Sequence, residues 1–128
     1  MNRVFKVSED REILASEWGD KDNPLVIMLH GGGQTRHSWK GVAAKIAHLG
    51  FHVIAHDLRG HGESFWDHDG NYTFDAHRDD LVRIIQQPRK KANLVGASLG
   101  GMISLSLAGH EEESKYCSGL IMVDIGMR

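Results

Sequence analysis

The chain has 128 residues, of which 41% are hydrophobic and 25% are charged, and its formal net charge at neutral pH is -2. This length fits one domain, and the composition is typical of soluble globular proteins rather than of disordered or fibrous ones. A charge so close to zero offers no basic face for nucleic acid. The one basic run, Arg89–Lys91, follows a proline, and we expect a solvated loop without a partner there.

The chain has a single cysteine, Cys117, which cannot form an internal disulfide and so fits a reducing compartment. Residues 1–13 carry charges throughout and lack an apolar stretch, so they predict neither a secretory signal nor a membrane anchor. We therefore expect a cytoplasmic protein that does not bind membranes, and its oligomeric state is left open.

The apolar residues alternate between strand and helix periods, which is typical of an α/β fold with a mostly parallel sheet and flanking helices. Two short strands, Val4–Val7 and Ile13–Trp18, predict an antiparallel hairpin. Leu25–Leu29 is apolar throughout and Phe51–Ala55 is nearly so, which favours strands buried on both faces. Apolar residues at helical spacing between these two strands predict a helix over residues 39–49.

The second half of the chain continues the alternation. A long loop rich in Gly, Asp and His is expected over His56–Gly70, followed by a helix with Thr73 as its N-cap. The strand Asn93–Val95, a helix from residue 99 to about 110, and the strand Leu120–Val123 complete the pattern. Ligands in such sheets bind at the carboxyl ends of the strands.

Glycine-bearing segments follow three of these strands: His30–Gly33, Asp57–Gly62 and Gly96–Gly101. The third contains a GxSxG motif, and its position between a predicted strand and a predicted helix is the one a nucleophile elbow needs. Small neighbours let the strand and the helix approach closely around a strained serine. Ser98 is therefore the candidate nucleophile.

Two backbone N–H groups near this serine are candidates for an oxyanion hole. Leu99 stands at a helix N-terminus, where unpaired donors favour a developing negative charge. Gly32 lies in the loop after an earlier strand and leaves the backbone open to a substrate. The alternative, in which Ser98 caps a helix in a phosphate-binding turn, fits badly because neither GxxxxGK[ST] nor GxGxxG occurs in the chain.

Three landmarks together resemble the α/β-hydrolase superfamily in their order and spacing: LHGGGQTRHSW, HDLRGHGES and VGASLGGM. The resemblance covers residues 25–128. The first landmark looks most like the branch that contains simple esterases, cofactor-free haloperoxidases (perhydrolases) and carbon–carbon bond hydrolases. The resemblance implies about six of the family's eight strands and no cofactor. It also implies structural roles for Asp57 and Arg59. The serine at position 98 argues against the epoxide-hydrolase and haloalkane-dehalogenase branches, which place aspartate there.

A reactive serine needs a histidine as base and normally an acid that orients it, in the order Ser, acid, His in this fold. The one histidine after Ser98 is His110, which we expect on the surface of the following helix. Asp124 follows the last predicted strand and is a candidate triad acid. A metal site at His56, His61 and His68 is not expected, because their spacing matches no zinc pattern and solvated loop histidines explain them.

The simplest hypothesis is that residues 1–128 form the N-terminal part of one α/β-hydrolase domain, with its cap, last strands and histidine beyond Arg128. The rival is a natural short chain that acts as a non-catalytic binding module or takes a histidine from another subunit. The leading function is a serine hydrolase acting on a small-molecule acyl substrate through an acyl-enzyme, with perhydrolase or carbon–carbon hydrolase chemistry as alternatives on the same site. We expect the 128-residue chain alone to be inactive and poorly soluble, because the last strand would leave an apolar edge exposed.

Overall fold

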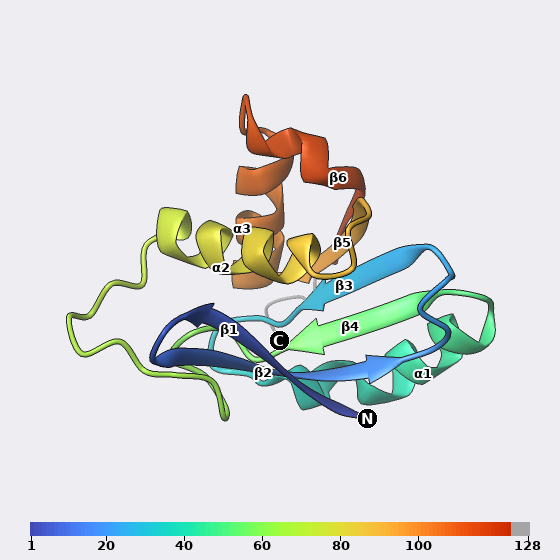
Figure 1. The fold of residues 1–128 in the computed structure, drawn as a ribbon, viewed down its shortest axis with the longest axis horizontal. Helices are drawn as coiled ribbons and strands as arrows, with labels where there is room; N and C mark the ends of the chain where they lie inside the picture. Colours follow the sequence, from blue (N-terminus) through green and yellow to red (C-terminus); the bar gives the residue numbers. More distant parts are fainter. Residues whose placement is uncertain (124–128) are drawn as a thin grey trace.

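The computed structural model describes residues 1–123, which form one six-stranded sheet with helices on both faces (Figure 1). The strand order is β1-β2-β4-β3-β5-β6. The strands are β1 (Asn2–Ser8), β2 (Arg11–Trp18), β3 (Leu25–Leu29), β4 (His52–His56), β5 (Ala92–Ala97) and β6 (Cys117–Val123). The helices are α1 (Lys40–His48), α2 (Phe74–Gln86) and α3 (Leu99–Ala108), with short 3-10 helices η1 (Arg36–Trp39) and η2 (Glu113–Tyr116).

The sheet is mostly parallel, as the sequence predicts. β1 and β2 form the expected antiparallel hairpin, and β2 also pairs antiparallel with β4. The remaining pairs, β3 with β4, β3 with β5 and β5 with β6, are parallel. In this register Leu29 faces His56 on one side and Gly96 on the other. The three glycine-bearing segments therefore leave the sheet at the same edge.

The two faces of the sheet bury different side chains of the same strands. Along β3, Leu25, Ile27 and Leu29 point to the face covered by α2 and α3, where they join the larger apolar core. Val26 and Met28 point to the opposite face, which α1 covers (Figure 1). All five residues of β3 are buried, so its uninterrupted apolar run is explained by packing on both faces.

Local chemistry explains where α2 begins and where α1 ends. The Thr73 hydroxyl accepts a hydrogen bond from the backbone N–H of Ala76 at 3.1 Å, which caps α2 as expected. Gly50, with φ +105°, follows the end of α1 in a backbone conformation that other residues adopt only with strain.

His56 does not belong to a solvated loop, which corrects the sequence prediction. It is the last residue of β4, lying between Leu29 of β3 and Ala15 of β2, and its side chain is 1% exposed. Pairing on both sides extends the strand one residue beyond its apolar run. Of the other two loop histidines, His68 is exposed and His61 is partly buried.

Strands β1, β2 and β5 are longer than predicted, and two further boundaries also differ from the predictions. Helix α3 ends at Ala108, so His110 lies in the turn beyond it, where its Nδ1 accepts the backbone N–H groups of Glu112 and Glu113. Strand β6 begins at Cys117, three residues early, because backbone pairing with β5 reaches past Gly119, where the side chains carry no apolar signal.

The surface follows the expectations in part. Ile121 and Met122 of β6 are 62% and 49% exposed, as predicted for an apolar edge. In the basic run, Arg89 and Lys91 are exposed, but the Lys90 ammonium donates to the carbonyls of Lys21 and Asn23. Among residues 1–123, no helix is both long and apolar enough to cross a membrane.

Candidate active site

Ser98 occupies the sharp turn between β5 and α3. Its backbone angles are φ +53° and ψ -115°, and within residues 1–123 only one other non-glycine residue, Arg89, has a positive φ. Such a conformation costs on the order of 1–3 kcal/mol and persists only where the surroundings impose it. The Ser98 side chain is exposed. The turn thus presents a hydroxyl to solvent at the carboxyl edge of the sheet.

The glycines of the elbow are required by close backbone contacts. A Cβ atom on Gly96 would lie 2.4 Å from the carbonyl oxygen of Gly100. A Cβ atom on Gly100 would lie 2.2 Å from the carbonyl oxygen of Leu29. Helix α3 is therefore pressed against the ends of both β5 and β3, and no residue with a side chain fits at either position. Gly101 is less constrained, with its nearest such contact at 3.2 Å.

The loop after β3 lies over the elbow. A Cβ atom on Gly31 would stand 3.4 Å from the Cβ of Ser98, and one on Gly32 would stand 3.8 Å from the Cβ of Leu99. Gly31 is buried, whereas Gly32 is exposed. The structure thus brings together Ser98, Leu99 and Gly32, the three residues that the sequence singles out for acyl transfer.

A small pocket of about 170 Å³ lies beside the elbow. Its walls come from the loop after β3, from η1, from the residue before the nucleophile position and from the end of β6: Gln34, Ser38, Trp39, Ala97 and Val123. Asp124, the candidate triad acid, is the next residue along the chain and lies outside the described residues.

His30 joins the loop after β3 to the loop after β4. The backbone N–H of Leu58 donates to its Nε2 at 3.0 Å, so that nitrogen carries no proton. The proton is therefore on Nδ1, which donates to the carbonyl of Gly31 at 2.7 Å. Burial lowers the pKa of His30, which favours this neutral form. His30 is fully buried, and both of its ring nitrogens are hydrogen-bonded to backbone, so it connects the two loops and is not free to act as a base.

Asp57 is held by a residue that the sequence interpretation missed, Arg36. The Asp57 carboxylate is fully buried and accepts the backbone N–H groups of Arg36 (2.7 Å) and Glu63 (3.0 Å), together with the Arg36 guanidinium. Burial would raise the pKa of Asp57, but these hydrogen bonds and the Arg36 charge outweigh it and leave the pKa below its usual value. Both carboxylate oxygens of Asp57 therefore accept hydrogen bonds within the fold, from Arg36 and from Glu63.

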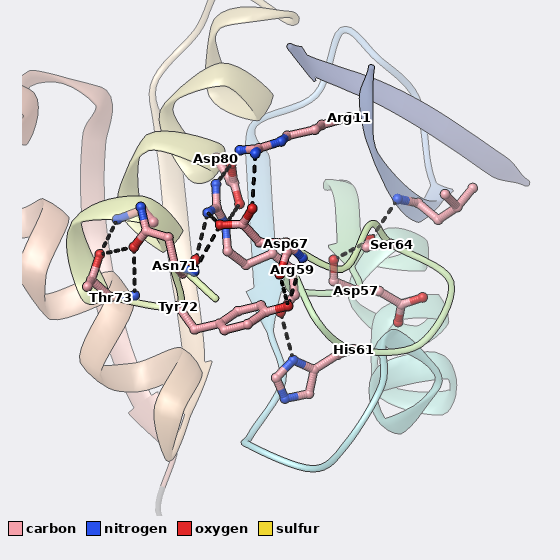
Figure 2. A network of polar contacts seen from close by, with 12 residues as sticks. Arg11, Asp57, Arg59, His61, Ser64, Asp67, Asn71, Tyr72, Thr73 and Asp80 are labelled. Carbon is pink, nitrogen blue, oxygen red and sulfur yellow. Dashed lines mark hydrogen bonds and ion pairs between the residues drawn. The ribbon is translucent and has the colours of Figure 1, made fainter. Parts of the chain in front are cut away.

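Arg59 anchors the same loop to helix α2 (Figure 2). Its guanidinium donates to both carboxylate oxygens of Asp80, at 2.7 and 2.8 Å, and to the carbonyl of Asn71 at 2.9 Å. Figure 2 also shows Asp67, which accepts a hydrogen bond from Arg11 at 3.0 Å. The pairing with Asp80 raises the pKa of Arg59. Arg59 thus has the kind of structural contact that we expected, and its main partner is Asp80, a residue of α2 that the sequence did not single out.

Within residues 1–123, no histidine is hydrogen-bonded to Ser98. All nine histidines precede residue 111. His52, His56 and His77 are buried, and each has an Nδ1 atom without a hydrogen-bond partner in residues 1–123. No group of three or more His, Cys, Asp or Glu side chains in that range is arranged to hold a metal ion.

Known proteins are similar to this chain in sequence over most of its length. Residues 24–127 match the family model described as alpha/beta hydrolase fold. An esterase of Mycobacterium tuberculosis is 39% identical over 114 residues, which make up 88% of this chain and 36% of the esterase. A bifunctional esterase/perhydrolase of Acinetobacter calcoaceticus is 32% identical over 91 residues, or 70% of this chain and 33% of that enzyme. The chain spans about a third of the length of these relatives.

A solved structure agrees with the sequence relatives. The thioesterase domain from the curacin biosynthetic pathway superposes with a TM-score of 0.86 at 29% identity, over 96% of this chain and 45% of that one. The sheet order, the glycine-lined elbow and these matches lead to one conclusion. The chain belongs to the α/β-hydrolase fold family, a family of hydrolase-type enzymes.

Proposed function

We propose that this chain carries the nucleophile and the oxyanion hole of a serine hydrolase that acts on a small-molecule ester or related acyl substrate. The observation that carries the proposal is the exposed Ser98 at a positive-φ elbow, with the loop of Gly31 and Gly32 against it. A strained turn that holds a serine at the edge of a sheet is the arrangement of a nucleophile elbow.

The chemistry follows from these positions. The Ser98 hydroxyl attacks the acyl carbon while a base takes its proton, and the carbonyl oxygen gains negative charge. The backbone N–H groups of Gly32 and Leu99 stabilise that oxyanion, with Leu99 at the N-terminus of α3. The bond to the leaving alcohol breaks as the base returns the proton to it. Water then cleaves the acyl group from Ser98 and restores the hydroxyl.

The base is proposed to come from outside these 128 residues. His30 is held between Gly31 and Leu58, and the other buried histidines are packed within the fold. The chain spans about a third of its curated relatives, so a longer protein has room for a histidine and for the rest of the sheet. Asp124 stays a candidate for the acid that orients this histidine.

Ester hydrolysis by the longer protein that contains these residues tests the proposal. We expect turnover of a short-chain p-nitrophenyl ester that falls by at least about a thousandfold in Ser98→Ala. Ser118→Ala, which changes an exposed serine on β6, should leave the rate unchanged. The 128-residue chain alone should show negligible turnover. Full activity in Ser98→Ala would refute the role of this serine.

Perhydrolysis is a second candidate, favoured by the similarity to the bifunctional esterase/perhydrolase of Acinetobacter calcoaceticus. In this reaction hydrogen peroxide replaces water as the group that attacks the acyl-enzyme, and the product is a peracid. Adding peroxide during ester turnover and measuring peracid by bromide oxidation distinguishes the two outcomes. Peracid that is lost in Ser98→Ala supports the second reaction, whereas ester hydrolysis without peracid excludes it.

A further inference from the structure

Gln34 makes two hydrogen bonds to a single residue of the loop above the elbow. Its backbone N–H donates to the carbonyl of Gly31 at 3.1 Å. Its side-chain oxygen, Oε1, accepts the backbone N–H of Gly31 at 3.0 Å. Because the partner of Oε1 is a donor, the side-chain oxygen and not the nitrogen must face it. Gln34 therefore holds both polar groups of Gly31.

The hydrogen bonds to Gly31 also determine the direction of the Gly32 N–H. The Gly31 carbonyl and the Gly32 N–H belong to one planar peptide unit, and in a trans peptide they point in opposite directions. The carbonyl is held from one side by Gln34 N–H and by Nδ1 of His30. The Gly32 N–H must then point away from these two donors. The Gly31 N–H belongs to the preceding peptide, which Oε1 of Gln34 holds, so loss of this oxygen frees one side of Gly31 and weakens the arrangement.

The chain between these residues is a tight turn. The hydrogen bond from Gln34 N–H to the Gly31 carbonyl closes it, and Gly33 has φ +77°, a conformation that favours glycine at this position. On the other side, Gly31 faces the elbow, because its Cβ position lies 3.4 Å from the Cβ of Ser98. A small displacement of the turn would therefore change the geometry at the serine.

We propose that Gln34 is a positioning residue for acyl transfer. Its side-chain oxygen holds the N–H of the His30–Gly31 peptide and its backbone N–H holds the carbonyl of the Gly31–Gly32 peptide, so that together they fix Gly31 in the conformation that lets the Gly32 N–H stabilise the oxyanion. The inference rests on the proposed hydrolase function. Gln34 is itself exposed, so its side chain contributes little to the core. Removing its oxygen should therefore affect the transition state more than the fold.

The test compares three variants in the longer protein that contains these residues. Gln34→Leu keeps the approximate size of the side chain and removes the acceptor, and kcat should fall by about tenfold to a hundredfold while KM stays within about twofold. Gln34→Glu keeps an oxygen acceptor and should retain more kcat than the leucine variant. Gln87→Leu makes the same change at the exposed end of α2 and should match the wild type.

The outcomes separate the two proposals. A wild-type protein without ester hydrolysis refutes the hydrolase function itself. A wild type that hydrolyses esters, with Gln34→Leu at the same kcat, refutes the positioning role alone. A rise in KM at unchanged kcat also refutes it, because it would place Gln34 in substrate binding. If Gln34→Leu does not fold, Gln34→Glu serves as the test. A loss of kcat in Gln34→Glu as large as the loss in Ser98→Ala would contradict the proposal, because Gln34→Glu keeps the oxygen acceptor.

Discussion

The backbone N–H of Leu58 donates a hydrogen bond to Nε2 of His30 at 3.0 Å, across 28 positions of sequence. The same imidazole donates through Nδ1 to the Gly31 carbonyl. One neutral ring therefore couples the loop after β3, which lies over Ser98, to the loop after β4, which the Asp57 and Arg59 contacts hold in place. The elbow and its surrounding loops thus form one connected polar structure.

Replacing His30 should destabilise the protein. His30→Ala leaves the buried Leu58 N–H and the Gly31 carbonyl without their side-chain partner and opens a cavity, so we expect a loss of about 2–4 kcal/mol in the free energy of unfolding. Urea unfolding measures it. The control is His48→Ala, an exposed histidine at the end of α1, which should change stability by less than about 0.5 kcal/mol. Equal changes in the free energy of unfolding in both variants would show that the hydrogen bonds of the buried ring do not stabilise the fold.

Two glycine-to-alanine substitutions should differ strongly in their effect on the free energy of unfolding. Gly100→Ala places a methyl group 2.2 Å from the Leu29 carbonyl oxygen and should destabilise by about 3 kcal/mol or more. Gly41→Ala adds the same methyl group to helix α1, where no atom outside the adjoining residues and the backbone of the helix itself lies within 4 Å, and should be neutral or stabilise by up to about 1 kcal/mol. The midpoint of thermal unfolding measures both. A tolerated Gly100→Ala would contradict the packing of α3 against β3.

The sequence predicts the elements whose signal is local. Leu25–Leu29 is apolar because both faces of β3 are covered, and Thr73 is recognisable because a cap acts on its own helix. The elbow is predictable for the same reason, since its strand, serine and glycines are adjacent. The start of β6 at Cys117 is not, because it depends on backbone pairing with β5 rather than on side chains.

Breaking the Arg59–Asp80 pair should be costly. Arg59→Met leaves the Asp80 carboxylate buried without its partner, which we expect to cost about 3–5 kcal/mol. The matched control is Asp75→Asn, which breaks the ion pair with Arg78 on the surface of α2, where the Asp75 side chain is 80% exposed. This control should cost less than about 1 kcal/mol. Urea midpoints that shift equally in both variants would contradict the difference in burial.

Acid should destabilise the fold through buried histidines, among them His56 and His77 together with His30. Burial lowers the pKa of His56 to about 3 and that of His77 to about 4, from an ordinary value of 6.5. As the pH falls below 6.5, the unfolded chain binds protons at these positions before the folded chain does. The free energy of unfolding should therefore fall between pH 6.5 and about 4, by up to about 1.4 kcal/mol per pH unit for each histidine.

Urea unfolding at a series of pH values measures this slope. His77→Gln removes one of these groups and should make the slope shallower in that window. His68→Gln removes an exposed loop histidine and should leave the slope as it is in the wild type. A slope that does not change in His77→Gln would show that this residue titrates normally in the folded protein.

The parts that the sequence could not predict are long-range. Arg36 reaches Asp57 across 21 positions, and Asp80 reaches Arg59 across the same separation, so neither partner is visible in a local motif. His56 is assigned to a loop because it follows the apolar run, although pairing with β2 and β3 buries it. The role of Gln34 depends on a turn whose geometry only the structure supplies.

Covalent labelling of Ser98 is the most direct test of its role as the nucleophile. The protein is treated at its full natural length with a fluorophosphonate, and the modified residue is located by mass spectrometry of its peptides. We expect one phosphonylated site, Ser98, with no labelling in Ser98→Ala and with labelling retained in Ser118→Ala. A folded wild-type protein that stays unlabelled, or a label on another serine, would contradict the claim that this elbow holds the nucleophile.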